Sequence, residues 1–209
     1  MSTKLIVANT EQMCSVVSLQ KALQKCGYRL LDDIPIISKL SEARDAVKAA
    51  VDLDSKVDAL QRLTSVLREC TNPSLLPTTL RLAGFTLTLQ AGSYRIEREV
   101  DEYSDAAGRY GDLKRKVEKL SNSYKEVQGD LERDVLEIEG LAKQAKSEQE
   151  RRALIALVRA EREADRAACE NRRAEMMQEI ERRAPGLCDQ ITKHEVGKKV
   201  QYVLVYRSP

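Results

Sequence analysis

The feature that most constrains this chain is a stretch of 78 residues, 106–183, that contains no proline. Because proline ends or kinks helices, so long a stretch without it is typical of very long helices. In the first half, apolar residues follow alternating spacings of three and four, interrupted only at Asp134. The members of this line are Leu113, Val117, Leu120, Tyr124, Val127, Leu131, Ile138 and Leu141. This spacing predicts a helix with one apolar edge that packs against a second helix.

The second half of the stretch is richer in alanine and less regular. A heptad line of mostly small residues runs along it, with Asn171 as the polar exception. Its members are Ala153, Leu157, Ala160, Ala164, Ala167 and Ala174. Small residues along a helix edge let two helices approach closely, so this half is a suitable partner for the first.

The end of the chain decides between one straight helix and a hairpin. A single helix over 106–183 would span about 117 Å at 1.5 Å per residue. Pro185 and Gly186 end the stretch, and residues 200–206 are then apolar on both faces, as in a strand inside a sheet. The other strand-like runs lie before residue 100, so the chain has to return to them. We therefore predict an antiparallel helical hairpin that folds back near residues 140–149, with a domain-swapped dimer of straight helices as the alternative.

Shorter elements are predicted before this stretch. Residues 3–8 are typical of a strand, residues 13–26 of a helix that ends at Gly27, and residues 28–31 of a second strand. Together they predict a β-α-β opening.

Two further helices and a hairpin are predicted next. The first helix covers about residues 38–51, and the second begins at Ser55 with Asp58 as a near capping box. Two alternating runs at 85–90 and 94–97 flank Ala91-Gly92, which predicts a β-hairpin.

These patterns predict an α+β, helix-dominated fold: a small α/β head with a long antiparallel helical hairpin. The head would consist of the β-α-β unit, the β-hairpin, a helix and two closing strands. We expect it to comprise residues 1–32, 78–124 and 185–209. Residues 33–77 would form a helical insertion, and residues 125–184 the helical hairpin arm.

Composition excludes several classes of site. His194 is the only histidine, so a multi-histidine metal site is impossible and we can assemble no catalytic set around it. The five cysteines include no C-x-x-C pair, which argues against a disulfide scaffold or a zinc ribbon. With no membrane-spanning run and no signal peptide, we expect a cytoplasmic, non-enzymatic protein without cofactor or metal.

Four segments of the predicted head resemble a known family. They are Leu23–Tyr28 (LQKCGY), Gly84-Phe85 followed by Tyr94–Asp101 (YRIEREVD), Leu113–Tyr124, and Pro185–Arg207. The chain thereby resembles the small uncharacterised domain found in cyanobacteria, in plastids as a hypothetical chloroplast reading-frame protein, and in other bacteria. The resemblance covers roughly half of the chain, and residues 33–72 and 125–184 have no counterpart in it.

That family has no established reaction, so the resemblance implies no catalytic residue. Its members are often encoded beside a AAA-type ATPase. The resemblance therefore implies an accessory component of an ATPase-driven assembly, in a stress or conflict system.

The helical arm suggests the function. A head needs no such arm for its own core, so we predict a non-enzymatic adaptor that docks partner proteins, with a AAA-type ATPase as the partner that the resemblance implies. The tip of the arm carries polar and basic residues that suit an acidic or helical partner: Lys143, Gln144, Lys146, Arg151 and Arg152. Self-association through the long apolar line is equally compatible with the sequence.

The alternative is a nucleic-acid-binding module. Bases would stack on Tyr28, Phe85 and Tyr94 of the predicted sheet. A basic cluster beside the head would contact phosphates: Lys114, Arg115, Lys116 and Lys119. The near-neutral net charge of +2 and the few aromatic residues favour the adaptor.

Overall fold

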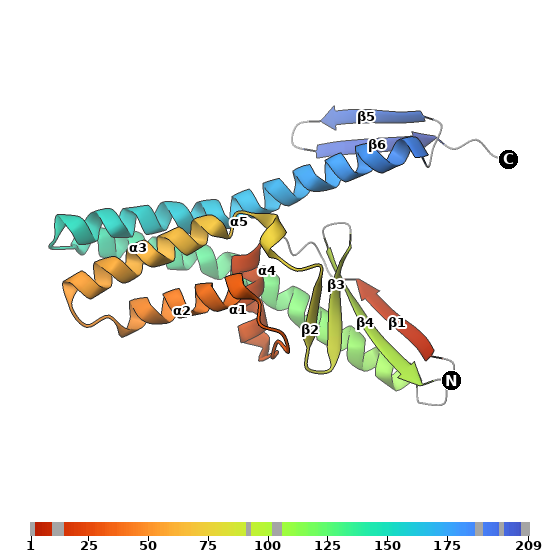
Figure 1. Cartoon of the computed structure of the whole chain (residues 1–209), viewed down its shortest axis with the longest axis horizontal. Coiled ribbons are helices and arrows are strands. Elements are labelled where there is room, and N and C mark those ends of the chain that lie inside the picture. Colours follow the sequence, from red (N-terminus) through yellow and green to blue (C-terminus); the bar gives the residue numbers. More distant parts are fainter. Residues whose placement is uncertain are drawn as a thin grey trace. The chain divides into compact units, whose positions relative to one another are not determined.

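The computed structural model describes residues 3–9, 15–90, 93–101, 106–186, 190–196 and 199–205 (Figure 1). It confirms the helix-dominated α+β class. The chain divides into two compact units, Met1–Asn171 and Arg172–Pro209. This division falls within the predicted arm at 125–184, and it assigns residues 185–209 to the second unit, apart from the rest of the predicted head.

The helices are α1 (Val16–Cys26), α2 (Pro35–Ala49), α3 (Leu53–Glu69), α4 (Ala106–Gln144) and α5 (Glu148–Arg183). The strands are β1 (Thr3–Asn9), β2 (Thr79–Leu82), β3 (Phe85–Gln90), β4 (Ser93–Asp101), β5 (Gln190–Val196) and β6 (Lys199–Val205). Short 3-10 turns lie at Pro73–Leu75 and Ala184–Gly186.

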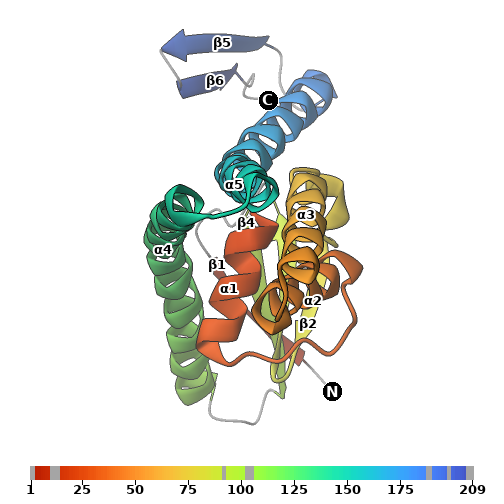
Figure 2. The same ribbon diagram turned by 90° about the vertical axis from the view of Figure 1, so that its left-hand side faces the viewer.

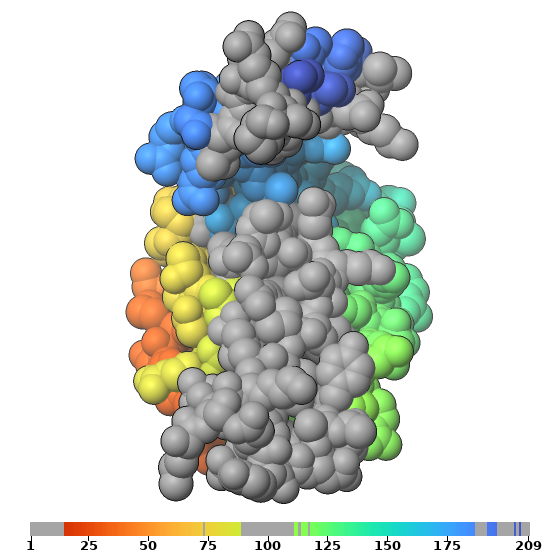
Figure 3. Space-filling view, turned by 90° about the vertical axis from the view of Figure 1, so that its right-hand side faces the viewer, coloured from red at the N-terminus to blue at the C-terminus, as the bar shows by residue number. Residues whose placement is uncertain are grey.

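The first unit contains a four-stranded antiparallel sheet in the order β1-β4-β3-β2. The predicted β3–β4 hairpin is confirmed, with Gln90 opposite Ser93. Strand β2 was not predicted, because four residues give too short an alternation, although Leu80 and Leu82 are buried and their neighbours exposed. It reaches β3 through Gly84, whose φ of 101° favours glycine. In Figure 3 the described side chains of β2 and β3 (yellow to yellow-green) and those of α4 (green) lie on opposite sides of one face.

Two strand predictions are wrong. Strand β1 pairs antiparallel with β4, and residues 28–31 contribute only an isolated bridge between Leu30 and Leu82, so there is no β-α-β unit. The described part of the strand predicted at 200–206 does not enter this sheet, because it belongs to β6, which pairs with β5 in a separate two-stranded sheet. Val196 lies opposite Lys199, and such a short connection favours pairing with the preceding strand.

The helical hairpin is confirmed: α4 ends at Gln144 and α5 begins at Glu148, within the predicted turn region. The buried line, however, leaves the heptad pattern after Leu131. Val135 and Ala142 are buried, whereas Asp134 forms an ion pair with Lys21 at 2.5 Å. The reason is that a straight helix has 3.6 residues per turn and drifts relative to a 3.5-residue repeat.

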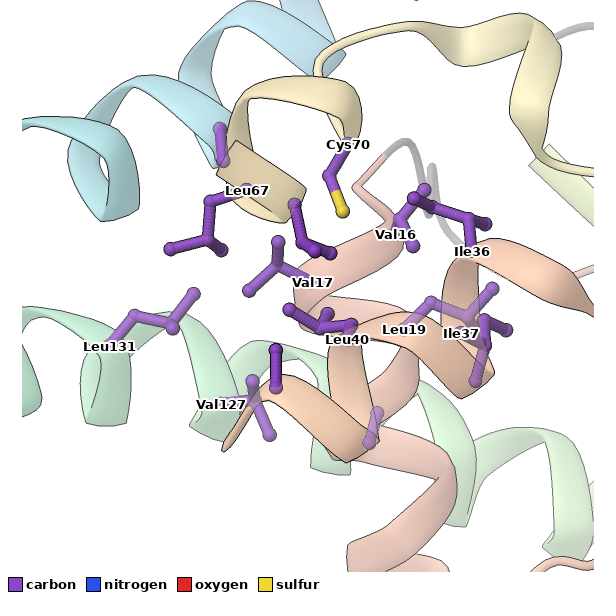
Figure 4. Close-up of a cluster of buried hydrophobic side chains, with 14 of the residues drawn as sticks. Val16, Val17, Leu19, Ile36, Ile37, Leu40, Leu67, Cys70, Val127 and Leu131 are labelled. Carbon is purple, nitrogen blue, oxygen red and sulfur yellow. The ribbon is translucent and has the colours of Figure 1, made fainter. Parts of the chain in front are cut away.

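Residues 33–77 share one hydrophobic core with the sheet and the hairpin. Fully buried Leu40 from α2 and Leu67 from α3 belong to the same cluster as Leu19 of α1 and Leu131 of α4 (Figure 4). Leu87 of β3 is a further member of this cluster. In Figure 2, α1 lies between α4 on one side and α2 with α3 on the other. Within the first unit, the hairpin is therefore the wall of a helical bundle and not a free arm.

The ends of the first three helices follow from the residues at those positions. Gly27 ends α1 in the left-handed conformation, φ 71°, as predicted. Helix α2 starts at Pro35, earlier than predicted, because proline fits the first turn, where its missing N–H is not needed. The predicted capping box at Ser55 is wrong: Asp52 caps α3 and accepts a hydrogen bond from the backbone N–H of Ser55 at 2.8 Å.

Candidate functional site

One candidate site lies where the α2–α3 connection meets the α4–α5 turn. A shallow hollow there is lined by Leu53, Lys56, Leu141, Gln144, Ala145, Lys146, Ser147 and Glu150. The four exposed residues of this lining and the exposed residues beside them form what we call the tip surface: Val51, Leu53, Leu141, Lys143, Gln144, Lys146, Arg151 and Arg152. Of the five residues predicted for docking, Gln144 and Lys146 line the hollow, and Lys143, Arg151 and Arg152 are exposed beside it.

Three apolar side chains of the tip surface are open to solvent. Val51 is 98% exposed, Leu53 44% and Leu141 46%. Leu141 is left outside because Ala142 takes the buried position of the hairpin. Sequence reasoning missed this contribution, since it assigned Leu141 to the buried line. A cluster of exposed large apolar residues is a feature of interaction sites.

The charges of the tip surface are only partly paired. The Nζ of Lys56 donates to Glu150 at 2.6 Å, which joins α3 to α5, and Arg152 pairs with Glu148 at 3.0 Å. Lys143, Lys146 and Arg151 are exposed and have no ion-pair partner among the described residues. The tip surface therefore offers unpaired positive charge around apolar side chains.

The predicted basic cluster on α4 has a different arrangement, because three of its four cations have acidic neighbours on the same helix. Lys116 and Arg115 lie 3.8 and 3.3 Å from the carboxylate of Asp112, and Lys114 lies 4.0 Å from Glu118. Cations that already pair with carboxylates are less available to phosphates.

The aromatic rings of the nucleic-acid hypothesis are already packed. Phe85 is buried and meets the Tyr28 ring edge-to-face at 5.1 Å between centroids. The Nζ atoms of Lys116 and Lys119 lie 5.7 and 5.5 Å from the ring centroids of Phe85 and Tyr28. Base stacking needs open ring faces, so this packing disfavours it. The side chain of Tyr94 lies outside the described residues.

A buried polar cluster, absent from the sequence-based predictions, lies inside the bundle. The carboxylate of Glu161 on α5 is 3.3 Å from the guanidinium of Arg44 on α2. Glu161 is 7% exposed, and burial raises its pKa, while the charge of Arg44 opposes that rise. Nearby, the hydroxyl of Ser18 donates to Asp165 at 2.6 Å. The sequence does not indicate that Glu161 is buried, because this residue lies beside the line of buried residues on α5 and has the charge of an ordinary surface residue.

Other candidate chemistry is sparse in the described ranges. His194 is exposed on β5 of the second unit. No group of three or more His, Cys, Asp or Glu residues could hold a metal ion in the part of the chain that the structure describes. Over the same residues, no helix has both the length and the apolar character needed to cross a membrane.

No protein-family model, curated protein or solved structure matches this chain. The resemblance to the cyanobacterial and plastid domain family therefore remains a prediction.

Cys70, a free cysteine at the end of α3, is expected to be inert. Burial raises the pKa of its thiol to about 12, so at pH 8 only about one thiol in ten thousand is ionised. Alkylation of the native protein with iodoacetamide, followed by mass spectrometry, should modify half-exposed Cys169 at least about ten times faster. Equal rates for the two cysteines in the native protein would contradict this assignment, and denaturant should abolish the difference.

Proposed function

We propose that this protein is a non-enzymatic, cytoplasmic adaptor that binds partner proteins through the tip surface. The observation that carries the proposal is the exposure of Val51, Leu53 and Leu141 beside cations that have no ion-pair partner among the described residues. Neither feature contributes to the core of the first unit.

The energetics of the tip surface support docking. Leu53 and Leu141 are each about half covered already, so a partner that buried the rest would gain about 1 kcal/mol from each. Fully exposed Val51 would add about as much again. Apolar contacts of this kind supply affinity, whereas the surrounding charges mainly set the rate of association and the choice of partner.

The partner chemistry follows from the charges. Lys143, Lys146 and Arg151 favour an acidic segment, and the apolar trio favours one that also presents an aliphatic or aromatic side chain. The family resemblance adds a specific expectation, namely that a AAA-type ATPase is among the partners.

The test is photo-crosslinking in the native host. A benzoylphenylalanine placed at Gln144 on the tip surface should capture a defined protein, and the same probe at exposed Gln24 on α1 should not. The captured protein is then purified, and its affinity is measured for wild type and for a variant that combines Leu53→Asp and Leu141→Asp. We expect that variant to bind at least about tenfold more weakly, because two apolar contacts are replaced by repelling charges.

The control is Leu31→Asp, which makes one such substitution at a leucine that is 59% exposed outside the tip surface. It should leave the affinity unchanged. The proposal is wrong if the tip variant keeps the wild-type affinity, or if the probes at Gln144 and Gln24 capture the same proteins. Capture of nucleic acid alone would instead favour the alternative function.

A further inference from the structure

The second unit is small for a fold that has to support itself. Arg172–Pro209 comprises 38 residues: the end of α5, a 3-10 turn and the hairpin of β5 and β6 (Figure 1). Units below about 40 residues usually need a disulfide, a metal or a second chain. This one holds a single cysteine, Cys188, so it cannot close a disulfide of its own. A two-stranded hairpin is, in addition, only marginally stable without further strands or a packed face.

One face of the hairpin is turned toward α5 and the other carries exposed apolar side chains. The Nζ of Lys193 on β5 lies 3.6 Å from the carboxylate of Glu181 on α5. Val203 on β6 is opposite Thr192, and side chains alternate between the two faces of a strand. Val203 and Val205 therefore lie on the face that does not carry Lys193, and they are 39% and 45% exposed.

The two strands differ in how their outer edges are protected. Native sheets place charged residues on an open edge, because an unprotected edge pairs with other strands. Strand β5 has exposed Lys193, His194 and Glu195. Strand β6 has no charged residue after Lys199, and no other described strand pairs with it. Strand β6 thus has the composition of an inner strand at the position of an edge strand.

The geometry of the hairpin determines which backbone groups of β6 face this open edge. Val196 lies opposite Lys199, so two residues connect the strands. Bonded and non-bonded pairs alternate along an antiparallel ladder, and the pair beside a two-residue turn is a bonded one. By this alternation, the N–H and C=O groups of residues 200, 202 and 204 point away from β5. A further strand along β6 would bind these groups.

We propose that β6 pairs with β6 of a second copy of this chain, antiparallel and about a two-fold axis at Tyr202. This register pairs all seven residues of β6, Lys199–Val205. The result is a sheet of four strands in the order β5-β6-β6-β5, two from each copy. The uncharged part of β6 is then inside the sheet, and the charged strand β5 forms both edges.

The chemistry of β6 favours a second copy as the occupant. Pairing about a two-fold axis uses the same surface on both chains and closes the assembly at a dimer, the commonest form of oligomer. In this register Lys199 lies opposite Val205 of the other copy, so no like charges oppose each other across the new ladder. The pairing also extends the hairpin to four strands, which supplies the neighbours that a lone hairpin lacks.

The oligomeric state of the full chain is the first test. We expect sedimentation velocity to show a monomer–dimer equilibrium with a dissociation constant below about 50 μM, because one pair of seven-residue strands is a small interface. The dimer does not rest on the tip surface, which belongs to the first unit. A chain that dimerises but captures no partner would therefore contradict the proposed function alone, and a monomeric chain that captures one would contradict the dimer alone.

Hydrogen exchange locates the contact without any substitution. The N–H groups of Tyr202 and Leu204 should exchange at least about threefold more slowly in the mostly dimeric protein at about 200 μM than at about 1 μM. The matched groups are the outward N–H groups of Lys193 and Glu195 on β5, which remain at an edge and should exchange equally at both concentrations. Mass spectrometry with electron-transfer fragmentation resolves these single amides.

A pair of variants separates pairing at the edge of β6 from packing of the exposed face. Val203→Lys puts the introduced charges of the two copies near the axis and near Lys199, so dimerisation should weaken at least about tenfold. Thr192→Lys introduces the same charge on the same face of the hairpin, but on β5, and should leave the dimer unchanged. Far-UV circular dichroism establishes that both variants are folded.

Three results would overturn the proposal. One is a wild-type chain that is still a monomer at about 200 μM, well above the expected dissociation constant. Another is equal weakening of the dimer by Val203→Lys and Thr192→Lys, which would mean that the face and not the edge makes the contact. The third is a dimer in which the amides of Tyr202 and Leu204 exchange as fast as in the monomer.

Discussion

Arg44→Ala is expected to lower the free energy of unfolding by about 3 kcal/mol at neutral pH. Arg44 is the cation that contacts buried Glu161, and its removal leaves a carboxylate in the bundle interior without that partner. Loss of one member of a buried ion pair typically costs about 3–5 kcal/mol. We expect the lower end, because Glu161 can take up a proton and Lys21 still lowers its pKa. Chemical denaturation followed by circular dichroism measures the change.

The structure offers a control in an exposed ion pair that also involves α2. Arg62 on α3 pairs with Glu42 on α2 at 3.5 Å, and both side chains are largely exposed. Arg62→Ala should therefore cost less than about 1 kcal/mol. Combining Arg44→Met with Glu161→Leu should recover most of the loss, because apolar residues can replace a buried pair. If Arg44→Ala costs no more than Arg62→Ala, the buried pair does not support the bundle.

The pH dependence of this variant has a defined sign. Burial raises the folded-state pKa of Glu161 above its unfolded value, so the folded protein holds this proton more tightly. The contribution of Glu161 to stability is therefore fully present below its unfolded pKa, and it is lost as the pH rises through the folded pKa. Arg44 limits that loss by favouring the ionised form. Arg44→Ala should accordingly be closest to wild type in stability at low pH and fall further behind as the pH rises.

The sequence predicts those parts of the fold that depend on neighbours along the chain. The hairpin turn before Glu148, the Gly27 cap and the β3–β4 pairing are all local. The position of Lys143 and Arg151 at the tip of the hairpin was predictable for the same reason. Both residues flank the turn, which lies where the regular apolar spacing gives way to the alanine-rich half.

What the sequence does not predict depends on the partner across the core. The apolar stripe of α3 shows that one face is buried, but not that it packs within the same core as α1 and α4. The ion pair of Arg44 with Glu161 joins residues 117 positions apart, and each looks like an ordinary surface charge in its own helix. The heptad spacing places Leu141 in the buried line, but Ala142 is buried there instead. The reason is that the 3.6-residue turn of the helix, and not the heptad spacing, decides which side chain faces the core.

Leu67→Ala is expected to lower the free energy of unfolding by about 2–5 kcal/mol. Leu67 on α3 is completely buried and belongs to the core cluster that includes Val17 of α1, Leu40 of α2 and Leu131 of α4 (Figure 4). Alanine leaves a cavity that four helices would have to collapse to fill. Denaturation in urea measures the loss, and Leu31→Ala at a mostly exposed leucine should change stability by no more than about 0.5 kcal/mol.

The same variant tests whether residues 33–77 are an independent insertion or part of the bundle. If α3 shares one cooperative core with the hairpin, Leu67→Ala must lower the hydrogen-exchange protection of α4 and α5 along with that of α3, since one global opening exposes them all. An independent insertion would instead lose protection in α2 and α3 alone. The packing of Leu67 in one cluster with Leu131 favours the shared opening. Unchanged exchange in α4 would contradict it and restore the predicted boundary.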